Sequence, residues 1–388
     1  MSLQKRLLLL TFLESFATIL LERGIYFYSE NRLDFSRSMN LYLALIFGVF
    51  YVAAALLCHP LANRVSERRV LIGSIGAHLL LHAAMLFWIN TPLLFAAMAV
   101  AAALNGLKWP VVESYITAGR SSRDQLKIIG QFNIAWASAV PLSLLVVGPI
   151  IGSSWPQGLF LLAVGVNAVS VMLALAAPKR PAHLAHDHPD RPSQATLQRY
   201  RVLLSSSRWS MLASYSLLFL LAPMLPQIFK RFEVGIIVAP AASALIDFVR
   251  LGSFAFLQRW HGWYGRTWPM WFCAIGLPIS AGMTLFAQSL ALVLIGEVIF
   301  GFCCGLTYYA ALYYVVAYKN AAVDAGGTHE GLIGGGFAFG PAAGLIGLAL
   351  ANHIGYAMGM TIGIAPLILL SIFGGLLPLR KLARTQPA

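Results

Sequence analysis

The stretch GTHEGLIGGGFAFGPAAG, residues 327–344, lies inside one of the most apolar parts of this 388-residue chain. It is rich in glycine, and it also contains Pro341 and an adjacent pair of ionisable residues, His329 and Glu330. Glycine weakens an isolated helix in water, and a carboxylate is costly in hydrocarbon. The combination therefore needs a fold in which helices pack closely while some polar side chains still reach water.

The composition of the whole chain points to a lipid bilayer. Hydrophobic residues make up 59% of the sequence and charged residues only 11%, and the mean hydropathy is +0.75. Soluble domains have about a quarter charged residues. The formal net charge is +13, but the basic residues lie in short loops between apolar runs. Membrane topology explains them better than nucleic-acid binding does, so no nucleic-acid partner is expected.

Apolar segments of spanning length recur along the chain. A membrane-spanning helix needs about 20 mainly apolar residues. The sequence therefore predicts an all-α polytopic membrane protein with twelve transmembrane helices. Because Glu14 interrupts the first apolar run, we expect this segment to be a retained helix and not a signal peptide. The predicted spans are 7–29, 40–62, 70–89, 92–117, 128–151, 156–177, 208–229, 234–258, 269–287, 290–316, 328–351 and 354–378.

Lysine and arginine concentrate in alternate loops. This asymmetry predicts that both termini and the long middle loop are cytoplasmic, in the inner membrane of a bacterial cell. The middle loop is the only long polar stretch, so the predicted organisation is an N-terminal six-helix bundle (1–177), a cytoplasmic linker (178–207) and a C-terminal six-helix bundle (208–388).

No metal or cofactor is predicted. The four cysteines lie in apolar segments and form neither a disulfide framework nor a CxxC motif. The linker histidines His183, His186 and His188 are expected to be solvated, with a metal site as the less favoured alternative. His78 and His82, spaced i and i+4, could chelate a metal, but hydrogen bonds to neighbouring helices are favoured. A nucleotide-binding loop is missing, so ATP is not the expected energy source.

The two halves share short motifs. GPIIG (148–152) recurs as GPAAG (340–344), and NGLKWP (105–110) resembles CGLTYY (304–309). Together these pairs suggest duplicated six-helix halves. In such transporters the substrate site lies between the halves, near the bilayer midplane.

At the loop after the second span, the chain resembles the major facilitator superfamily. HPLANRVSERR (59–69) is similar to the family's cytoplasmic loop motif G-x-x-x-D-R-x-G-R-R. Asn63 stands for the Asp, Arg64 matches, Ser66 replaces the second Gly and Glu67 departs from an Arg. The resemblance, which covers the whole chain, implies gating roles for Asn63 and Arg64.

The opening stretch resembles the family's antiporter motif, G-x8-G-x3-G-P-x2-G-G. Gly327, Gly336, Gly340, Pro341 and Gly344 fit, but the family carries this motif in the fifth helix, whereas here it lies in the eleventh. Small residues at helical spacing let neighbouring helices approach closely, and a proline permits a bend. We therefore expect Gly336, Gly340 and Pro341, together with His329, to act in gating. The alternatives are static packing for each glycine and a simple hydrogen bond for His329.

Ionisable residues within the spans have a biased distribution. The resemblance implies that helices 1, 2, 4, 5, 7, 8, 10 and 11 surround a central cavity. A charge at the bilayer centre costs about 2.5–3.5 kcal/mol on insertion scales, so it normally faces a partner or water. The charged residues and the His–Glu pair within the spans all fall on these inner helices: Glu14, Glu22, Arg23, Lys108, Glu113, Asp247, Arg250, Glu297, His329 and Glu330.

Roles follow from spacing and chemistry. A carboxyl group in a low dielectric favours its neutral form, so Glu14, Glu330 and Glu22 are candidate proton carriers, with a helix cap or gate as the alternative for Glu330. Asp247 and Arg250, three apart, can form an ion pair, with Arg250 as a substrate anchor the rival interpretation. The predicted substrate-binding residues are Arg23, Tyr26, Lys108, Glu113, Asp247, Arg250, Tyr309 and Tyr313, with Glu113 as a possible counter-ion of Lys108.

The sequence thus predicts a monomeric secondary active transporter. It would move a small amphiphilic, zwitterionic or anionic organic solute across the bilayer by alternating access, coupled to protons. An enzyme is not expected, because neither HExxH nor GxSxG occurs. The alternatives are a non-transporting membrane sensor or scaffold with the same fold, and an exporter of drug-like compounds by proton antiport.

Overall fold

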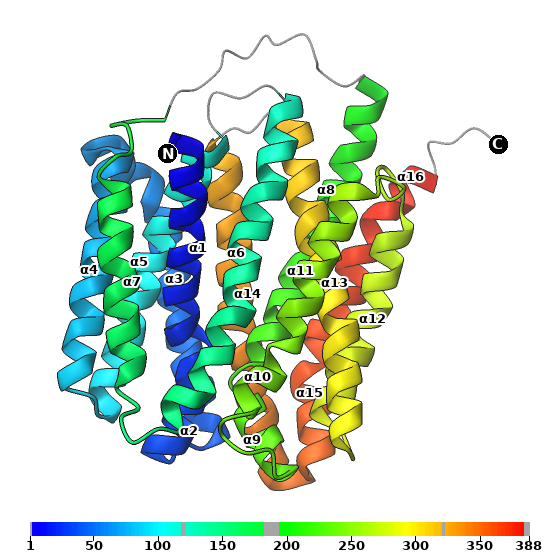
Figure 1. Ribbon diagram of the computed structural model, residues 1–388. Helices are drawn as coiled ribbons and strands as arrows, with labels where there is room; N and C mark the ends of the chain where they lie inside the picture. The colour runs from blue at the N-terminus through cyan, green and yellow to red at the C-terminus, as the bar shows by residue number, and fades with distance from the viewer. Residues whose placement is uncertain (1, 118–121, 182–193, 320–322, 384–388) are drawn as a thin grey trace.

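Long helices that run side by side make up the molecule, and the first and last residues that the structure describes lie at the same end (Figure 1). The computed structural model describes residues 2–117, 122–181, 194–319 and 323–383, and this part of the chain contains no strand. The helices are α1 Leu3–Glu22, α2 Gly24–Leu33, α3 Arg37–Val65, α4 Glu67–Phe87, α5 Thr91–Thr117, α6 Ser122–Ile151, α7 Gly158–Ala174, α8 Gln194–Leu221, α9 Leu225–Arg231, α10 Ala239–Ser243, α11 Leu245–Arg259, α12 Trp268–Leu285, α13 Leu290–Lys319, α14 Val323–Ile354, α15 Tyr356–Leu369, η1 Leu370–Gly374, η2 Leu377–Leu379 and α16 Arg380–Ala383.

Most of these helices are suited to a bilayer. Within the described residues, nine helical segments are long and apolar enough to cross a membrane, and two of them, Ala239–Arg259 and Tyr356–Leu382, each join several of these elements. The bent pair α8 and α9 forms a tenth such span. The 20-residue α1 and the shorter apolar α7 occupy the places of the remaining two predicted spans. The predicted all-helical architecture is therefore confirmed.

The seventh span differs from the prediction at its start. It was expected to begin near residue 208, but α8 begins at Gln194. Hydropathy identifies only the apolar part of a helix, and the polar turns before residue 208 continue the same helix beyond it. The linker histidines His183, His186 and His188 lie outside the described residues.

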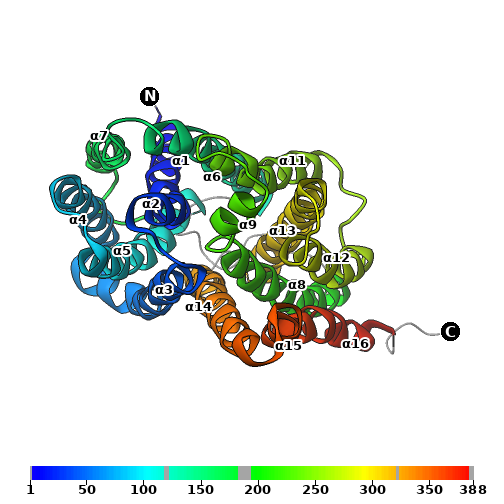
Figure 2. The same ribbon diagram turned by 90° about the horizontal axis from the view of Figure 1, so that it is seen from below.

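The helices form two bundles. Seen from below, α1–α7 lie on one side and α8–α16 on the other (Figure 2). At the boundary α3 packs against α14, and α6 packs against α11. Any central site must therefore be built from both halves of the chain.

Glycines allow α14 to touch both bundles. A Cβ built on Gly340 would lie 1.9 Å from the Ser216 carbonyl oxygen of α8, and one on Gly336 would lie 2.5 Å from Tyr215. On the other bundle, a Cβ on Gly48 of α3 would lie 2.3 Å from the Phe337 carbonyl carbon. Close approach of three backbones thus explains the glycine-rich stretch. Gly331 is different, because nothing lies within 4 Å of its Cβ position.

Two spans are broken in the part of the chain that the structure describes, and the breaks lie in the halves of those spans that are farther from the termini (Figure 1). The first span turns at Arg23 between α1 and α2, whereas α10 and α11 meet at Ala244 within one continuous span, Ala239–Arg259. The α8–α9 pair is bent by 52°. Discontinuous helices often supply polar groups to the substrate sites of transporters.

Candidate functional site

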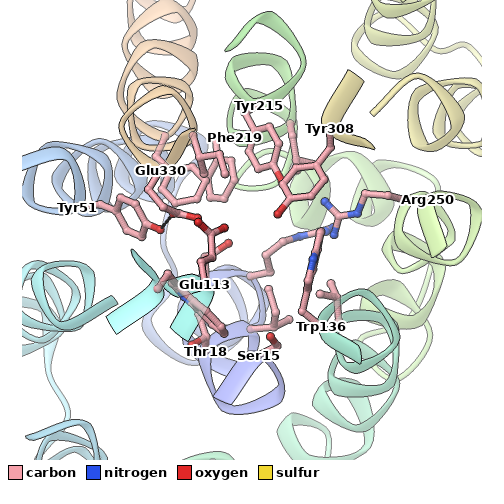
Figure 3. A pocket seen from close by; sticks show the side chains of 18 of the residues that line it. Ser15, Thr18, Tyr51, Glu113, Trp136, Tyr215, Phe219, Arg250, Tyr308 and Glu330 are labelled. Carbon is pink, nitrogen blue, oxygen red and sulfur yellow. Dashed lines mark hydrogen bonds between the residues drawn. The ribbon is translucent and has the colours of Figure 1, made fainter. Parts of the chain in front are cut away.

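A cavity of about 100 Å3 lies at the boundary between the bundles (Figure 3). Side chains from α1, α3, α5 and α6 line it on one side, and side chains from α8, α11, α13 and α14 line it on the other. These elements belong to spans 1, 2, 4, 5, 7, 8, 10 and 11, the set expected to surround a central cavity. The volume is below the roughly 300–1,000 Å3 of typical small-molecule pockets, so this conformation encloses little space.

One wall of the cavity is acidic. Glu113 on α5 and Glu330 on α14 both line the cavity, and their carboxyl groups lie close to each other across the two bundles (Figure 3). The Tyr51 hydroxyl on α3 also donates a hydrogen bond to Glu330. Two carboxyl groups can hydrogen-bond to each other only when at least one of them carries a proton. The arrangement therefore has a place for a proton between the bundles.

The opposite wall is basic. Arg250 donates to Asp247 at 2.6 Å, so the predicted i,i+3 pair is present. Arg23 of the other bundle also contacts Asp247, at 2.5 Å. All three side chains are buried. Asp247, which was predicted to bind substrate but does not itself line the cavity, thus links two arginines from different bundles, and these three side chains together carry one positive charge in excess.

Arg250 also faces the cavity, and its guanidinium carbon lies 4.8 Å from the centroid of the Trp136 ring on α6. Both sequence interpretations of Arg250 therefore fit its position: it forms an ion pair, and it lines the cavity. Glu22, next to Arg23, lines the cavity as well, and no hydrogen bond or ion pair of its side chain occurs among the described residues.

Aromatic rings fill the space between the acidic and basic walls. Trp136 packs edge-on against Tyr308 of α13, with ring centroids 5.1 Å apart. The rings of Phe219 on α8 and Phe337 on α14 also line the cavity, and their centroids lie 3.9 Å apart. These rings offer an apolar contact surface for a solute with a planar or hydrophobic part.

Some predicted substrate residues lie elsewhere. Tyr309 and Tyr313 do not line the cavity; both pack against Trp263, at 5.7 and 5.2 Å between ring centroids. The neighbouring Tyr308 reaches the cavity instead, because adjacent residues on a helix point in different directions. Tyr26 is fully buried, and it is not among the lining residues.

Glu14 and Lys108 form a separate polar cluster inside the first bundle. Lys108 donates to Glu14 at 2.8 Å, and Asn167 donates to the other carboxylate oxygen at 2.9 Å. His82 contacts Asn167 at 2.6 Å. The sequence interpretation suggested Glu113 as the counter-ion of Lys108. The structure shows that the counter-ion is Glu14. Neither Glu14 nor Lys108 lines the cavity.

The expected gating residues lie at two places. Gly336, Gly340 and Pro341 are in the part of α14 that packs on α8. His329 is buried beside Tyr308, with 5.1 Å between ring centroids, and neither ring nitrogen has a partner among the described residues. His329 directly precedes Glu330, which belongs to the acidic wall.

Asn63 and Arg64 lie near the end of α3, away from the cavity. The Asn63 side chain contacts His59 at 3.1 Å. Ser66 directly after α3 has φ 104° and ψ 149°, a backbone region that is normally occupied by glycine. The residue that replaces the motif's second glycine therefore keeps a glycine-like conformation.

Sequence reasoning missed Tyr51 as a partner of Glu330, and it did not connect Glu113 with Glu330. A tyrosine in the middle of an inner span was the available signal for Tyr51, since tyrosine at span ends is explained by the membrane interface but tyrosine at mid-span is not.

Comparisons with known proteins agree with this architecture. The family model of the Major Facilitator Superfamily matches residues 7–328. No curated protein sequence matches the chain. Among solved structures, a bacterial homologue of the human lysosomal transporter Spinster, in an inward-facing and unoccupied conformation, has a TM-score of 0.68 at 14% identity, and the match covers 100% of this chain and 98% of that one.

Two further solved structures are similar. The human organic anion transporter MFSD10 has a TM-score of 0.67 at 15% identity, covering 96% of this chain and 100% of that one. The nucleoside transporter NupG has a TM-score of 0.63 at 13% identity, covering 99% of this chain and 100% of that one. At these identities the likeness concerns the fold.

Proposed function

The chain belongs to the Major Facilitator Superfamily, and from that premise we propose that it is a secondary active transporter that moves a small organic solute by alternating access, coupled to protons. The observation that carries the proposal is the central cavity, in which carboxyl groups from the two bundles meet. A proton held between these carboxyl groups would stabilise the contact between α5 and α14. This contact must change when the bundles move relative to each other.

Contacts between the bundles on both sides of the cavity support alternating access. On the side away from the termini, Lys230 of α9 contacts Glu30 of α2 at 2.6 Å. On the side of the termini, a Cβ built on Gly130 of α6 would lie 2.8 Å from the Gln258 side chain of α11. Movement of the bundles relative to each other would have to break one of these contacts.

The walls of the cavity favour an amphiphilic or zwitterionic solute. Arg250 offers a cation for a carboxylate or phosphate, and the guanidinium fork suits such planar or tetrahedral anions. Glu113, Glu330 and Glu22 offer acceptors for an amine or hydroxyl group. Between them Trp136 and Tyr308 present ring surfaces. An organic molecule with polar ends and an apolar body satisfies all three regions.

Proton coupling rests on Glu330 and Glu113, with Glu22 as a further candidate. If both carboxyl groups ionise in a buried site, their like charges repel and the contact between α5 and α14 weakens. If they share a proton, the contact holds. Glu14, by contrast, is held by Lys108 and Asn167, and so we assign it to the stability of the first bundle.

The protein is an integral membrane protein. We propose that it resides in a bacterial inner membrane as a monomer, with both termini in the cytoplasm, because its basic residues favour the end that carries the termini. The cavity lies within one chain, so transport by this route needs no second copy.

Proteoliposomes with an imposed pH gradient test the proposal. Solutes are first selected by thermal stabilisation of the purified protein and then tested for uptake and for counterflow without a gradient. We expect Glu330→Gln and Glu113→Gln to abolish gradient-driven accumulation while counterflow continues. Glu233→Gln, an exposed residue remote from the cavity, serves as the matched control and retains both activities.

Infrared spectroscopy gives an independent reading of the same pair. The wild-type protein should show the carbonyl band of a protonated carboxyl group that disappears in Glu330→Gln. Accumulation that persists in both glutamine variants would contradict the proton assignment. Solute binding without any flux would favour the sensor interpretation over transport.

A further inference from the structure

A second, larger hollow lies on the outer surface of the C-terminal bundle, at the end that carries the termini. It has a volume of about 530 Å3 and lies between the start of α8, the start of α12 and the last span. It shares no lining residue with the central cavity. This groove is lined by Arg199, Thr267, Trp271, Phe373, Leu377 and Arg380, among others.

An irregular helix forms one wall of this groove. The last span changes from α15 to a π-helix at Leu370–Gly374 and then to a short 3-10 turn at Leu377–Leu379. The Ser206 hydroxyl of α8 donates a hydrogen bond to the Gly375 carbonyl, which fixes this segment against α8. Helical irregularities of this kind often occur at functional sites.

The groove wall is apolar and accessible. Phe373 is 51% exposed, Leu377 is 46% exposed and Trp271 is 51% exposed. In a bilayer, these surfaces face lipid and not water. Tryptophan at the end of a span is typical of the headgroup region.

The mouth of the groove is basic. Arg199 from α8 and Arg380 from α16 both line the groove, although they are far apart in the sequence. Arg199 is held in place because its Nε donates to the Gly265 carbonyl at 2.6 Å. Arg380 is exposed. No acidic residue lines the groove in the described part of the chain, so the two charges are not neutralised within it.

The start of α12 adds to this positive potential. Thr267, the residue before the helix, lines the groove, and α12 is 18 residues long. The first N–H groups of a helix carry partial positive charge and favour an anion. The mouth therefore suits a phosphate group, and the walls suit hydrocarbon.

We propose that this groove binds one anionic phospholipid of the leaflet at the termini's end of the molecule. Arg199 and Arg380 contact the phosphate of the headgroup, and an acyl chain lies along Trp271, Phe373 and Leu377. Basic pockets between spanning helices at this depth attract anionic lipids. Each arginine near the membrane surface raises the affinity roughly fivefold. The groove volume is within the range of small-molecule sites.

Lipid titration of the full-length protein in neutral detergent, followed by native mass spectrometry, tests the site. The probes are phosphatidylglycerol and phosphatidylcholine with identical acyl chains, and soluble glycerol phosphate as a chain-free competitor. We expect the wild type to prefer phosphatidylglycerol. In Arg199→Gln/Arg380→Gln this lipid should bind on the order of 30-fold more weakly, with phosphatidylcholine binding unchanged.

Two variants sharpen the result. Arg380→Gln alone keeps the Arg199 contact with Gly265 and should lose about fivefold. Arg201→Gln removes an exposed arginine of the same helix that does not line the groove, and it should bind like the wild type. Unchanged binding in the double variant would overturn the proposal. So would an equal loss in Arg201→Gln, or complete displacement of the lipid by glycerol phosphate.

Discussion

Single residues show where this chain tolerates backbone strain. Ser66 links α3 to α4 with a positive φ of 104°, in a region that side chains with a Cβ rarely adopt. Its backbone N–H bonds to the Ala62 carbonyl and its carbonyl accepts from Val70, at 2.9 and 3.1 Å. Both neighbouring helix ends therefore hold the strained conformation.

Replacing Ser66 with glycine should stabilise the protein. Ser66→Gly removes the Cβ that is strained at this φ, and the expected gain is about 1–3 kcal/mol, seen as a higher melting temperature in detergent. Ser66→Ala keeps the Cβ and serves as the control, for which we expect no gain. Equal stabilisation in both variants would show that the hydroxyl, and not the backbone, determines the effect.

Helices in this molecule meet through small residues at a few contact points. The Gly336, Gly340 and Gly344 row of α14 lies against α8, where added Cβ atoms would come within 1.9–2.7 Å of neighbouring atoms. Lipid gives helices little hydrophobic reason to associate, so such close packing supplies much of the association energy. Gly331 of the same helix faces open space.

The two kinds of glycine predict opposite outcomes. Gly340→Ala should destabilise the fold by about 1–3 kcal/mol, because the methyl group meets the Ser216 backbone and α14 must shift. Gly331→Ala should be neutral or slightly stabilising, since alanine is the better helix former. Thermal unfolding in detergent measures both. If the two variants had similar stability, the close contact between α14 and α8 would be wrong.

The whole molecule consists of two bundles that touch at both ends of a small cavity. At the end that carries the termini, Gly130 of α6 faces Gln258 of α11, and at the other end Glu30 faces Lys230. Alternating access requires that these contacts separate in turn. The four native cysteines are buried, which leaves the surface of the boundary open to engineered cross-links.

A disulfide across the boundary should arrest transport. In Gly130→Cys/Gln258→Cys, a Cβ at residue 130 would lie 3.3 Å from the Gln258 Cγ, close enough for a disulfide to form on oxidation. We expect uptake into proteoliposomes to stop on oxidation and to recover on reduction. The two single-cysteine variants are the controls. Undiminished uptake by the fully cross-linked protein would refute movement at this contact.

Much of the site was predictable from the sequence because charges in hydrocarbon must face a partner or water. That argument placed Arg23, Glu113, Arg250 and Glu330 on inner helices, and all four line the cavity. It did not distinguish these side chains from Glu14, which belongs to the same class of buried carboxylate but faces Lys108 inside one bundle.

The sequence by itself determined the membrane environment, the helical class and the resemblance to the superfamily, because apolar length and small-residue spacing are local properties of a chain in lipid. The tertiary structure alone decided which side chains meet: Glu330 with Glu113 and Tyr51, and Asp247 with Arg23. These contacts join distant segments, and they depend on how each helix is rotated and tilted against its neighbours. Spacing within a single helix carries no information about that rotation.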